Sequence, residues 1–404
     1  MAKLRIGLIR EGKVPLDRRV PLAPLSARYI NQNFTNVEVV CQSSHHRAYS
    51  DQEYLELGVK VVKDLSDCDV LFGVKEVSVS ELVPNKCYFF FSHTIKAQEY
   101  NRHLLRTILD KKITLVDYEC LTNSSGTRLL AFGRYAGIVG AYNSIWAYGQ
   151  RYKLFDIRRA HDCFDLQQLQ EEYAKVKLPP IKVALTGGGR VGKGAMEVLN
   201  GLGIRQVTAA QFIDQNYPGP VYTQLNSRDY HVNKNGTLFN RREFFADPEN
   251  YQSSFKQFAN HADILIAGAY WDPRAPVLFT HQDVLQPDFK IKVIGDITCD
   301  IEGSIPATKK ASTIDNPLYD YNPSEDKVED LFTDEANLTV MSIDNLPGEL
   351  PRDASLDFGE DLIRNVLPHL IESDNQQVIS RATITNQGVL TDRFSYLQDF
   401  VDGN

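Results

Sequence analysis

Short apolar runs alternate with amphipathic stretches through the N-terminal part of the chain. The apolar runs are typical of buried strands, and in the stretches between them apolar positions recur three or four residues apart. Such alternation is typical of βαβ units, in which helices cover a parallel sheet. It predicts strands at 4–10, 37–42, 68–75, 87–93 and 113–119, and helices at 24–33, 50–62 and 98–112.

A second alternation of the same kind begins at Ile181. The polar segment 211–254 interrupts it and is unusually long for a connection, so we expect an insertion there. The pattern predicts strands at 181–186, 205–214, 262–270 and 289–298, and a helix at 195–203 that ends at a glycine.

Two further segments predict how these parts connect. Residues 135–152 are apolar on most sides, which suits a long buried helix between domains, and the helix-like run 358–373 is expected to return to the first domain. The sequence therefore predicts an α/β fold with two Rossmann-like domains, whose parallel sheets are separated by a cleft and linked by long helices. We expect a substrate-binding catalytic domain at 1–135 plus about 350–404, and a dinucleotide-binding domain at 136–349.

Three glycines follow the apolar run 181–186. Gly187, Gly189 and Gly192 have G-x-G-x-x-G spacing, which permits a tight turn, close approach to a pyrophosphate and close helix packing. Arg190 adds a cation where the helix begins. Asp214 comes 22 positions after Gly192, close to where an acidic residue would bind a ribose hydroxyl. The glycines alone also fit an ordinary turn.

Composition narrows the classes of protein that the chain can represent. It has 404 residues, of which 43% are hydrophobic and 24% charged, as in ordinary soluble globular proteins. The six cysteines form no C-x-x-C pair, so we expect reduced thiols and no metal. The net charge of −8, without a cluster of Lys and Arg, argues against nucleic-acid binding. No apolar segment approaches the length of a membrane span, and we expect a cytoplasmic protein.

Titratable side chains stand where several predicted strands end. Lys75 and Glu76 end one apolar run, His93 ends a second and Glu119 a third. Ligands in open parallel sheets bind beyond the carboxyl ends of the strands, so these groups could share proton transfer. A solvated lysine and a structural histidine are the ordinary alternatives.

Several further side chains could bind a carboxylate: one follows the turn-like segment 14–18, and the others lie near these positions in the sequence. Arginine suits this task because its planar fork makes two hydrogen bonds at once. Surface solvation explains any one of these residues equally well. The candidates are Arg19, Lys96, Gln98 and Arg128.

A family resemblance connects these separate features. The blocks RRVPLAP, GVKE, FSHTIKAQ, VDYECL, LLAFGRYAGIVGA, GDITCDIEGSIPAT and SIDNLPGELPRDAS occur in this order around the glycine loop. With them the chain resembles, over nearly its full length, the alanine dehydrogenase, transhydrogenase alpha and saccharopine dehydrogenase superfamily. It looks most like the saccharopine branch and the related lysine-ketoglutarate reductases.

The resemblance implies roles for individual residues. The position of Lys75 implies a general base and that of His93 an acid-base group, with Glu76 and Glu119 as supporting carboxylates. Substrate contacts are implied for Arg19, Lys96, Gln98, Arg128, Phe132, Thr298, Cys299 and Asp300. Cofactor contacts are implied for Gly187, Gly189, Arg190, Val191, Gly192, Asp214, Tyr270, Ile297, Ile343, Asp344, Asn345 and Leu346.

The resemblance also implies a reaction, the interconversion of saccharopine with L-lysine and 2-oxoglutarate. The expected cofactor is NAD, with NADP possible and no metal, and the expected partner is a small-molecule substrate, with an oligomer possible. The alternatives are an alanine dehydrogenase and a transhydrogenase alpha-like nucleotide-binding subunit. Retention of both Lys75 and His93 argues against a catalytically silent protein.

Overall fold

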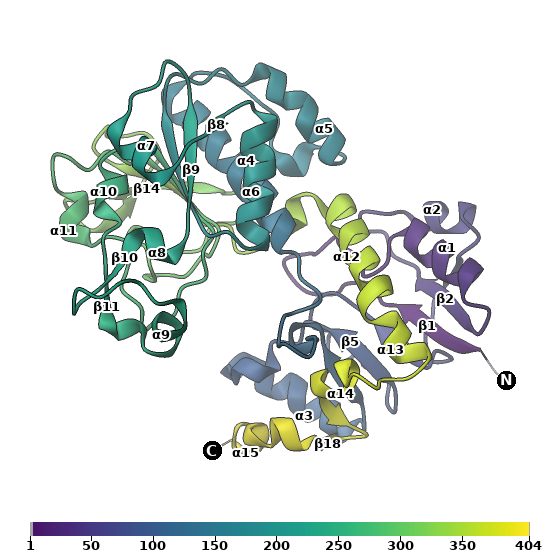
Figure 1. The fold of residues 1–404 in the computed structure, drawn as a ribbon. Helices are drawn as coiled ribbons and strands as arrows, with labels where there is room; N and C mark the ends of the chain where they lie inside the picture. The colour runs from purple at the N-terminus through teal and green to yellow at the C-terminus, as the bar shows by residue number, and fades with distance from the viewer. Residues whose placement is uncertain (1–2, 404) are drawn as a thin grey trace. The chain divides into compact units, whose positions relative to one another are not determined.

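The computed structural model describes residues 3–403, which divide into two compact units (Figure 1). Unit 1 comprises Met1–Phe132 and Pro351–Asn404, and unit 2 comprises Gly133–Leu350. A long helix begins at each position where the chain passes from one unit to the other, at Gly133 and at Pro351.

Unit 1 is built on an eight-stranded sheet in the order β18-β17-β6-β5-β4-β1-β2-β3. Strands β1 to β6 are parallel to one another, whereas β17 and β18 add an antiparallel edge. The strands are β1 (Leu4–Leu8), β2 (Val37–Gln42), β3 (Lys60–Val62), β4 (Val70–Phe72), β5 (Cys87–Phe90), β6 (Thr114–Asp117), β17 (Thr383–Asn386) and β18 (Val389–Leu390). The helices are α1 (Pro24–Asn33), α2 (Asp51–Glu56), α3 (Arg102–Asp110), α12 (Pro351–Asn365), α13 (Leu367–Ile371), α14 (Val378–Ala382) and α15 (Gln398–Asp402).

Both faces of this sheet are buried, which explains why its strands are nearly continuous apolar runs. Phe72 and Phe89 pack in a core cluster with residues of α1 and α12. Leu71 and Phe90, which point to the opposite face, pack with residues of α3 and α15. The predicted alternation of strands and helices is confirmed, except that 50–62 is not one helix but α2 followed by β3.

Unit 2 contains a second eight-stranded sheet in the order β15-β14-β16-β13-β12-β7-β9-β8, and a separate two-stranded sheet. The strands are β7 (Lys182–Thr186), β8 (Arg205–Gln206), β9 (Val221–Leu225), β10 (His231–Asn233), β11 (Tyr251–Ser253), β12 (Ile264–Ala267), β13 (Val293–Asp296), β14 (Leu318–Asn322), β15 (Lys327–Glu329) and β16 (Leu338–Met341). The helices are α4 (Gly133–Tyr152), α5 (Leu166–Glu171), α6 (Arg190–Gly201), α7 (Ala209–Asp214), α8 (Ser227–Tyr230), α9 (Arg241–Ala246), α10 (Lys256–Ala259) and α11 (His281–Val284).

The long helix α4 belongs to the core of unit 2. It packs against α6, β12, β13 and β16, and most of its residues are buried. The predicted buried helix at 135–152 is therefore confirmed, although it belongs to unit 2 and not to a segment between the domains.

Two sequence predictions for unit 2 are wrong. Residues 205–214 form the two-residue strand β8 and then helix α7, not one strand. A capping box starts this helix, because Thr208 and Gln211 bond each other's backbone N–H groups. The segment 211–254 is not only an insertion, because it contains β9, which pairs in parallel with β7 inside the main sheet.

Three further observations concern the described residues. No helix within 3–403 combines the length and apolar character that crossing a bilayer requires. All six cysteines are free thiols. Over the same residues, no three or more His, Cys, Asp or Glu side chains gather as a metal site.

Candidate active site

Four candidate groups stand at one edge of the unit 1 sheet. Lys75 follows β4, His93 follows β5, Glu119 follows β6, and Glu11 follows β1. These four strands are neighbours in the sheet and run parallel. Their carboxyl ends therefore meet at the same edge, as the sequence predicted for the first three residues.

Glu76 holds two of the titratable groups together. His93 Nδ1 lies 2.6 Å from Glu76 Oε1, and Lys13 Nζ donates to Glu76 Oε2 at 2.6 Å. Burial opposes ionisation of this carboxyl, but the hydrogen bonds from His93 and Lys13 prevail and lower the pKa of Glu76 to about 2. Glu76 is therefore an anion at neutral pH, and it orients the imidazole through Nδ1.

Lys75 is half-buried beside this pair. Burial, and then the positive charge of Arg19, lowers the pKa of the Lys75 ammonium below its usual value. Among the described residues 3–403, none forms a hydrogen bond or an ion pair with Lys75 Nζ. The side chain is thus available to exchange a proton with a ligand.

Glu11 fixes the backbone that carries Lys75. Its two carboxyl oxygens accept hydrogen bonds from the backbone N–H groups of Val74, at 2.7 Å, and Lys75, at 2.9 Å. Burial raises the pKa of Glu11 to about 8, although the two N–H donors oppose this shift. No sequence pattern had indicated Glu11, although it follows strand β1 just as Lys75 follows β4.

Arg19 is buried and already bound to a carboxylate. Its guanidinium donates from Nε to Asp17 Oδ1 at 3.0 Å and from a terminal nitrogen to Asp17 Oδ2 at 2.6 Å. The guanidinium also stacks on Phe132, 4.2 Å from the ring centre. A substrate carboxylate at Arg19 therefore has to share the cation with Asp17.

The other predicted substrate contacts are less tightly assembled. Arg128 lies 3.4 Å from Glu119 Oε1 and over the ring of Phe91, so Glu119 contacts Arg128 rather than Lys75 or His93. Lys96 and Gln98 are exposed, in the short turns that follow His93.

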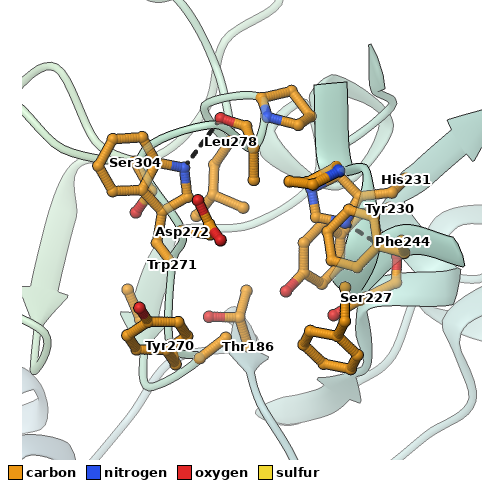
Figure 2. A pocket seen from close by; sticks show the side chains of 16 residues that line it. Thr186, Ser227, Tyr230, His231, Phe244, Tyr270, Trp271, Asp272, Leu278 and Ser304 are labelled. Carbon is orange, nitrogen blue, oxygen red and sulfur yellow. Dashed lines mark hydrogen bonds between the residues drawn. The ribbon is translucent and has the colours of Figure 1, made fainter. Parts of the chain in front are cut away.

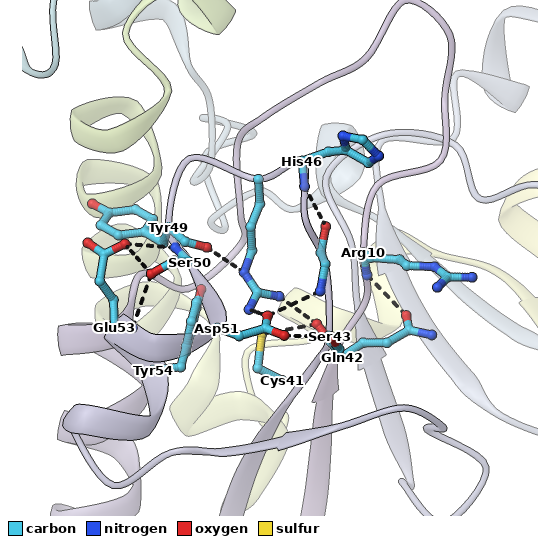
Figure 3. A network of polar contacts seen from close by, with 12 residues as sticks. Arg10, Cys41, Gln42, Ser43, His46, Tyr49, Ser50, Asp51, Glu53 and Tyr54 are labelled. Atoms are coloured by element: carbon cyan, nitrogen blue, oxygen red, sulfur yellow. Dashed lines mark hydrogen bonds and ion pairs between the residues drawn. The ribbon is translucent and has the colours of Figure 1, made fainter.

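A network of polar contacts surrounds the carboxyl end of strand β2, at Gln42 (Figure 3). Arg47 donates to the carbonyl oxygens of Gln42 and Tyr49 and forms an ion pair with Asp51. The Tyr49 hydroxyl in turn donates to the carbonyl of Arg352, at the start of α12. This network joins the returning C-terminal segment to the sheet edge that carries Lys75, and no sequence motif had indicated it.

The glycine loop of unit 2 has the geometry that a dinucleotide requires. Gly187 adopts φ = 94°, and a Cβ at Gly192 would lie 2.0 Å from the Gly187 carbonyl oxygen, so neither position accepts a side chain. At Gly189, the N-cap of α6, the Cβ position faces open space. The backbone N–H groups that open the helix, with Arg190 and Val191, thus have room for a phosphate. These residues fit a dinucleotide.

The remaining predicted cofactor and substrate residues of unit 2 follow three other strand ends. Asp296, the last residue of β13, accepts hydrogen bonds from Thr298 Oγ1 at 2.6 Å and Thr308 Oγ1 at 2.7 Å, and burial raises the pKa of its carboxyl. It thereby fixes the turn after β13. Following β12, β13 and β16 are Tyr270, then Ile297, Thr298, Cys299 and Asp300, then Ile343, Asp344, Asn345 and Leu346.

Asp214 does not lie at this edge. It ends helix α7, and the carbonyl groups of Phe212 and Gln215 beside it accept hydrogen bonds from Lys182, the first residue of β7. This is the amino end of the strand whose carboxyl end leads into the glycine loop. Asp214 therefore lies at the opposite end of β7 from the glycine loop, a position that does not suit the predicted contact with a ribose.

The residue that takes the expected place after β9 is Asn226. Its Oδ1 lies 2.8 Å from where a Cβ of Gly188 would be, so this amide stands against the glycine loop. Arg228 follows two residues later, with a largely exposed side chain.

Family models match both parts of the chain. The model "Alanine dehydrogenase/PNT, N-terminal domain" matches residues 7–139, and "Alanine dehydrogenase/PNT, C-terminal domain" matches residues 168–397. The chain belongs to the alanine dehydrogenase/PNT family. The resemblance inferred from the sequence blocks is confirmed.

Two groups of curated proteins are similar to this chain. The mitochondrial alpha-aminoadipic semialdehyde synthase of Mus musculus is 32% identical over 97% of this chain and 47% of its own length. The chain thus spans about half the length of the first relatives that it matches. Saccharopine dehydrogenase (NAD(+), L-lysine-forming) of Yarrowia lipolytica is 25% identical over 94% of this chain and 96% of its own.

Solved structures of two proteins share the alanine dehydrogenase/PNT fold of this chain. An L-alanine dehydrogenase superposes with a TM-score of 0.64 at 16% identity, covering 99% of both chains. A transhydrogenase from Sinorhizobium meliloti gives 0.60 at 16% identity, covering 96% of this chain and 98% of its own. These structures confirm the two Rossmann-like sheets.

Proposed function

We propose that the enzyme interconverts saccharopine with L-lysine and 2-oxoglutarate, using NAD(P). The observation that carries the proposal is the cluster of Lys75, Glu76 and His93, with an available lysine of lowered pKa beside a carboxylate-bound imidazole. The similarity to L-lysine-forming saccharopine dehydrogenases over nearly the whole chain supports this choice among CH–NH substrates.

Each residue of the cluster has a step that suits its state. A bound nicotinamide would supply the acceptor for the hydride that leaves the carbon next to the secondary amine. Lys75 takes the amine proton, because burial and the charge of Arg19 lower the pKa of its ammonium and so favour the neutral amine. His93 exchanges protons with the water that adds to the resulting imine, through Nε2, since Nδ1 is held by Glu76. The carbon–nitrogen bond then breaks, releasing lysine and 2-oxoglutarate.

Cations at the same sheet edge suit the charge of this substrate. Saccharopine carries three carboxylates, and Arg19, Arg128 and Lys96 belong to the segments around the cluster. We propose that they bind these carboxylates, with Gln98 and Phe132 completing the contacts and Glu119 holding Arg128 in place.

We propose that the glycine loop and the strand ends of unit 2 hold the dinucleotide. Gly187–Gly192 would hold the pyrophosphate, because the helix dipole and the N–H groups there favour an anion. Thr298–Asp300 and Ile343–Leu346 follow β13 and β16, which are neighbours in the same sheet, and would hold the nicotinamide end of the dinucleotide.

The end of strand β9 favours NADP over NAD. A carboxylate that binds the 2′-hydroxyl is typical of NAD sites, whereas a nearby Arg accommodates the 2′-phosphate of NADP. Here the position carries Asn226, and Arg228 projects two residues later. We propose that Arg228 binds the 2′-phosphate.

The activity is tested by following NAD(P)H oxidation with lysine plus 2-oxoglutarate and, separately, with pyruvate plus ammonia. We expect turnover with the first pair only. Activity with pyruvate and ammonia alone would instead identify an alanine dehydrogenase, and hydride exchange between nucleotides without either pair a transhydrogenase-like subunit.

Variants of the cluster test the residue roles. Lys75→Met and His93→Gln should each lower kcat by about 10²-fold or more while leaving nucleotide binding intact. Lys63→Met and His103→Gln change exposed residues of the same types in unit 1 and should keep wild-type turnover. Unchanged kcat in both cluster variants would remove these residues from the mechanism.

The cofactor preference is tested by comparing kcat/KM for NADPH and NADH. Arg228→Ala should lower kcat/KM for NADPH by about 10-fold or more and leave that for NADH unchanged, because a charge-assisted bond to phosphate is lost. Arg205→Ala, which alters an exposed arginine at the start of β8, is the control. A wild-type preference for NADH contradicts the assignment of Arg228.

A further inference from the structure

Aromatic side chains gather at strand ends in both units. In unit 2 they line a pocket that Thr186 and Ala267 also line, so this pocket belongs with the proposed dinucleotide site (Figure 2). In unit 1 they form a cluster, the aromatic platform, which consists of Phe91, Tyr118, Phe132 and Phe358. Phe91 and Tyr118 directly follow β5 and β6, so the platform lies at the edge that carries the proposed catalytic residues.

Phe358, on helix α12, holds the aromatic platform together. Its ring stacks on that of Phe132, with the centres 4.5 Å apart and an angle of 10° between the planes. It meets Tyr118 edge to face at 5.2 Å, and its centre lies 6.0 Å from that of Phe91. Phe358 is 2% exposed. Because a close-packed interior leaves such rings little room to shift, Phe358 fixes the positions of the other rings.

Two rings of the platform each carry an arginine that the proposed reaction uses to bind a carboxylate. The guanidinium of Arg19 lies 4.2 Å from the ring centre of Phe132, and that of Arg128 lies 5.4 Å from the ring centre of Phe91. The face of an aromatic ring attracts a guanidinium group and aligns its plane. The centres of these two rings are 6.0 Å apart. The relative position of the two guanidinium groups therefore depends on the platform.

Helix α12 also fixes the backbone beside Arg19. The Val20 N–H donates to Ser355 Oγ at 2.9 Å. A Cβ at Gly359 would lie 3.3 Å from the Pro21 carbonyl oxygen, so the helix approaches this segment closely. The same helix thus holds the chain that carries Arg19 and the ring that supports its side chain.

We propose that Phe358 is a positioning residue, which sets the distance between the guanidinium groups of Arg19 and Arg128 and so selects dicarboxylates by the separation of their two carboxylates. The inference rests on the proposed binding of carboxylates by these arginines. A bidentate pair needs the guanidinium and the carboxylate in one plane, so a small displacement of either arginine weakens binding. The C-terminal segment then contributes to the substrate site through α12, without supplying a group that touches the substrate.

The test measures binding of 2-oxoglutarate, a dicarboxylate, to the full chain by calorimetry. Saturating NAD(P)H is present and lysine is absent, so that no turnover is needed. Phe358→Met nearly keeps the volume of the side chain but removes the flat ring. It should raise the Kd for 2-oxoglutarate by about 10-fold and leave the Kd for NAD(P)H unchanged. It should also reduce the preference for 2-oxoglutarate over oxaloacetate, whose carboxylates are separated by one carbon fewer, at least about three-fold.

Two further variants separate positioning from packing. Phe394→Met makes the same change in the core on the other face of the unit 1 sheet, where Phe394 is 4% exposed. It should lower the melting temperature as Phe358→Met does, but keep the wild-type affinity and preference. Phe132→Leu should weaken 2-oxoglutarate binding, and adding Phe358→Met should weaken it little further, because Phe358 acts on Arg19 through Phe132.

The outcomes distinguish this inference from the proposed reaction. Unaltered 2-oxoglutarate affinity in Phe358→Met, or an equal loss in Phe394→Met, overturns the positioning role even if the enzyme oxidises saccharopine. A wild-type protein that does not bind 2-oxoglutarate overturns it as well. Binding of 2-oxoglutarate that depends on Phe358, without saccharopine turnover, overturns the proposed reaction and not the positioning role.

Discussion

Replacing Glu76 by Gln tests whether this carboxylate holds the proposed catalytic edge together. Its two oxygens contact different nitrogen atoms, His93 Nδ1 and Lys13 Nζ, each at 2.6 Å. The Glu76 side chain is 10% exposed, so solvent does little to replace these contacts. Glutamine keeps the shape of the side chain and one acceptor, but it removes the negative charge.

The expected loss of stability follows from the pKa. A fall from 4.5 to about 2 corresponds to about 3.4 kcal/mol, at roughly 1.36 kcal/mol for each pKa unit. Lys13 is 35% exposed and solvent screens its part of the interaction, so we expect a net loss of about 2 kcal/mol at pH 7. Because the folded-state pKa is lowered, the contribution is present above pH 4.5 and is lost as the pH falls through about 2. At pH 3.5 it should be about 60% of its value at pH 7.

The assay has to report on unit 1, because both tryptophans, Trp146 and Trp271, belong to unit 2. Pulse proteolysis in urea, with fragments identified by mass spectrometry, gives the unfolding free energy of each unit. Glu99→Gln is the matched control, since Glu99 also lies 2.6 Å from a cation, Arg102, but is 76% exposed and should contribute well under about 1 kcal/mol. A Glu76→Gln variant as stable as wild type at pH 7, or equally destabilised at both pH values, refutes the reasoning.

Two further predictions concern the glycine loop and Glu11. Gly192→Ala should abolish nucleotide binding in calorimetry, since its Cβ would meet the Gly187 carbonyl at 2.0 Å, whereas Gly219→Ala, with nothing within 4 Å, should bind normally. Glu11→Gln keeps one acceptor for the backbone N–H groups of Val74 and Lys75, so it should lower kcat less than Glu11→Ala, which removes both acceptors and releases the Lys75 backbone. Because the folded-state pKa of Glu11 is raised, its contribution to the free energy of unfolding is fully present below pH 4.5 and is lost as the pH rises through about 8. The melting temperature of Glu11→Gln, measured relative to that of wild type, should therefore rise from pH 5 to 8. If the melting temperature of Glu11→Gln does not rise relative to wild type over this range, the protonated state of the Glu11 carboxyl is contradicted.

Local pattern determined much of this protein. Strands buried on both faces appear as apolar runs, so β1, β4, β5 and β6 and the polar residues at their ends could be predicted without knowing which strands pair. The glycine spacing likewise reflects a local turn and helix start. The same local reasoning failed at 205–214, where the capping residues Thr208 and Gln211 were a readable sign of a helix.

Tertiary structure decided which of these residues act together. Only the order of the strands brings Glu11 to Lys75 and joins Glu76 to both His93 and Lys13, because residues far apart in sequence meet through pairing that no periodicity encodes. Strand register and helix packing also place Asp214 at the amino end of β7, away from the glycine loop, and place Asn226 against that loop. The sequence determined the kinds of chemistry that the chain carries, and the packing of its sheets determined where each side chain can use it.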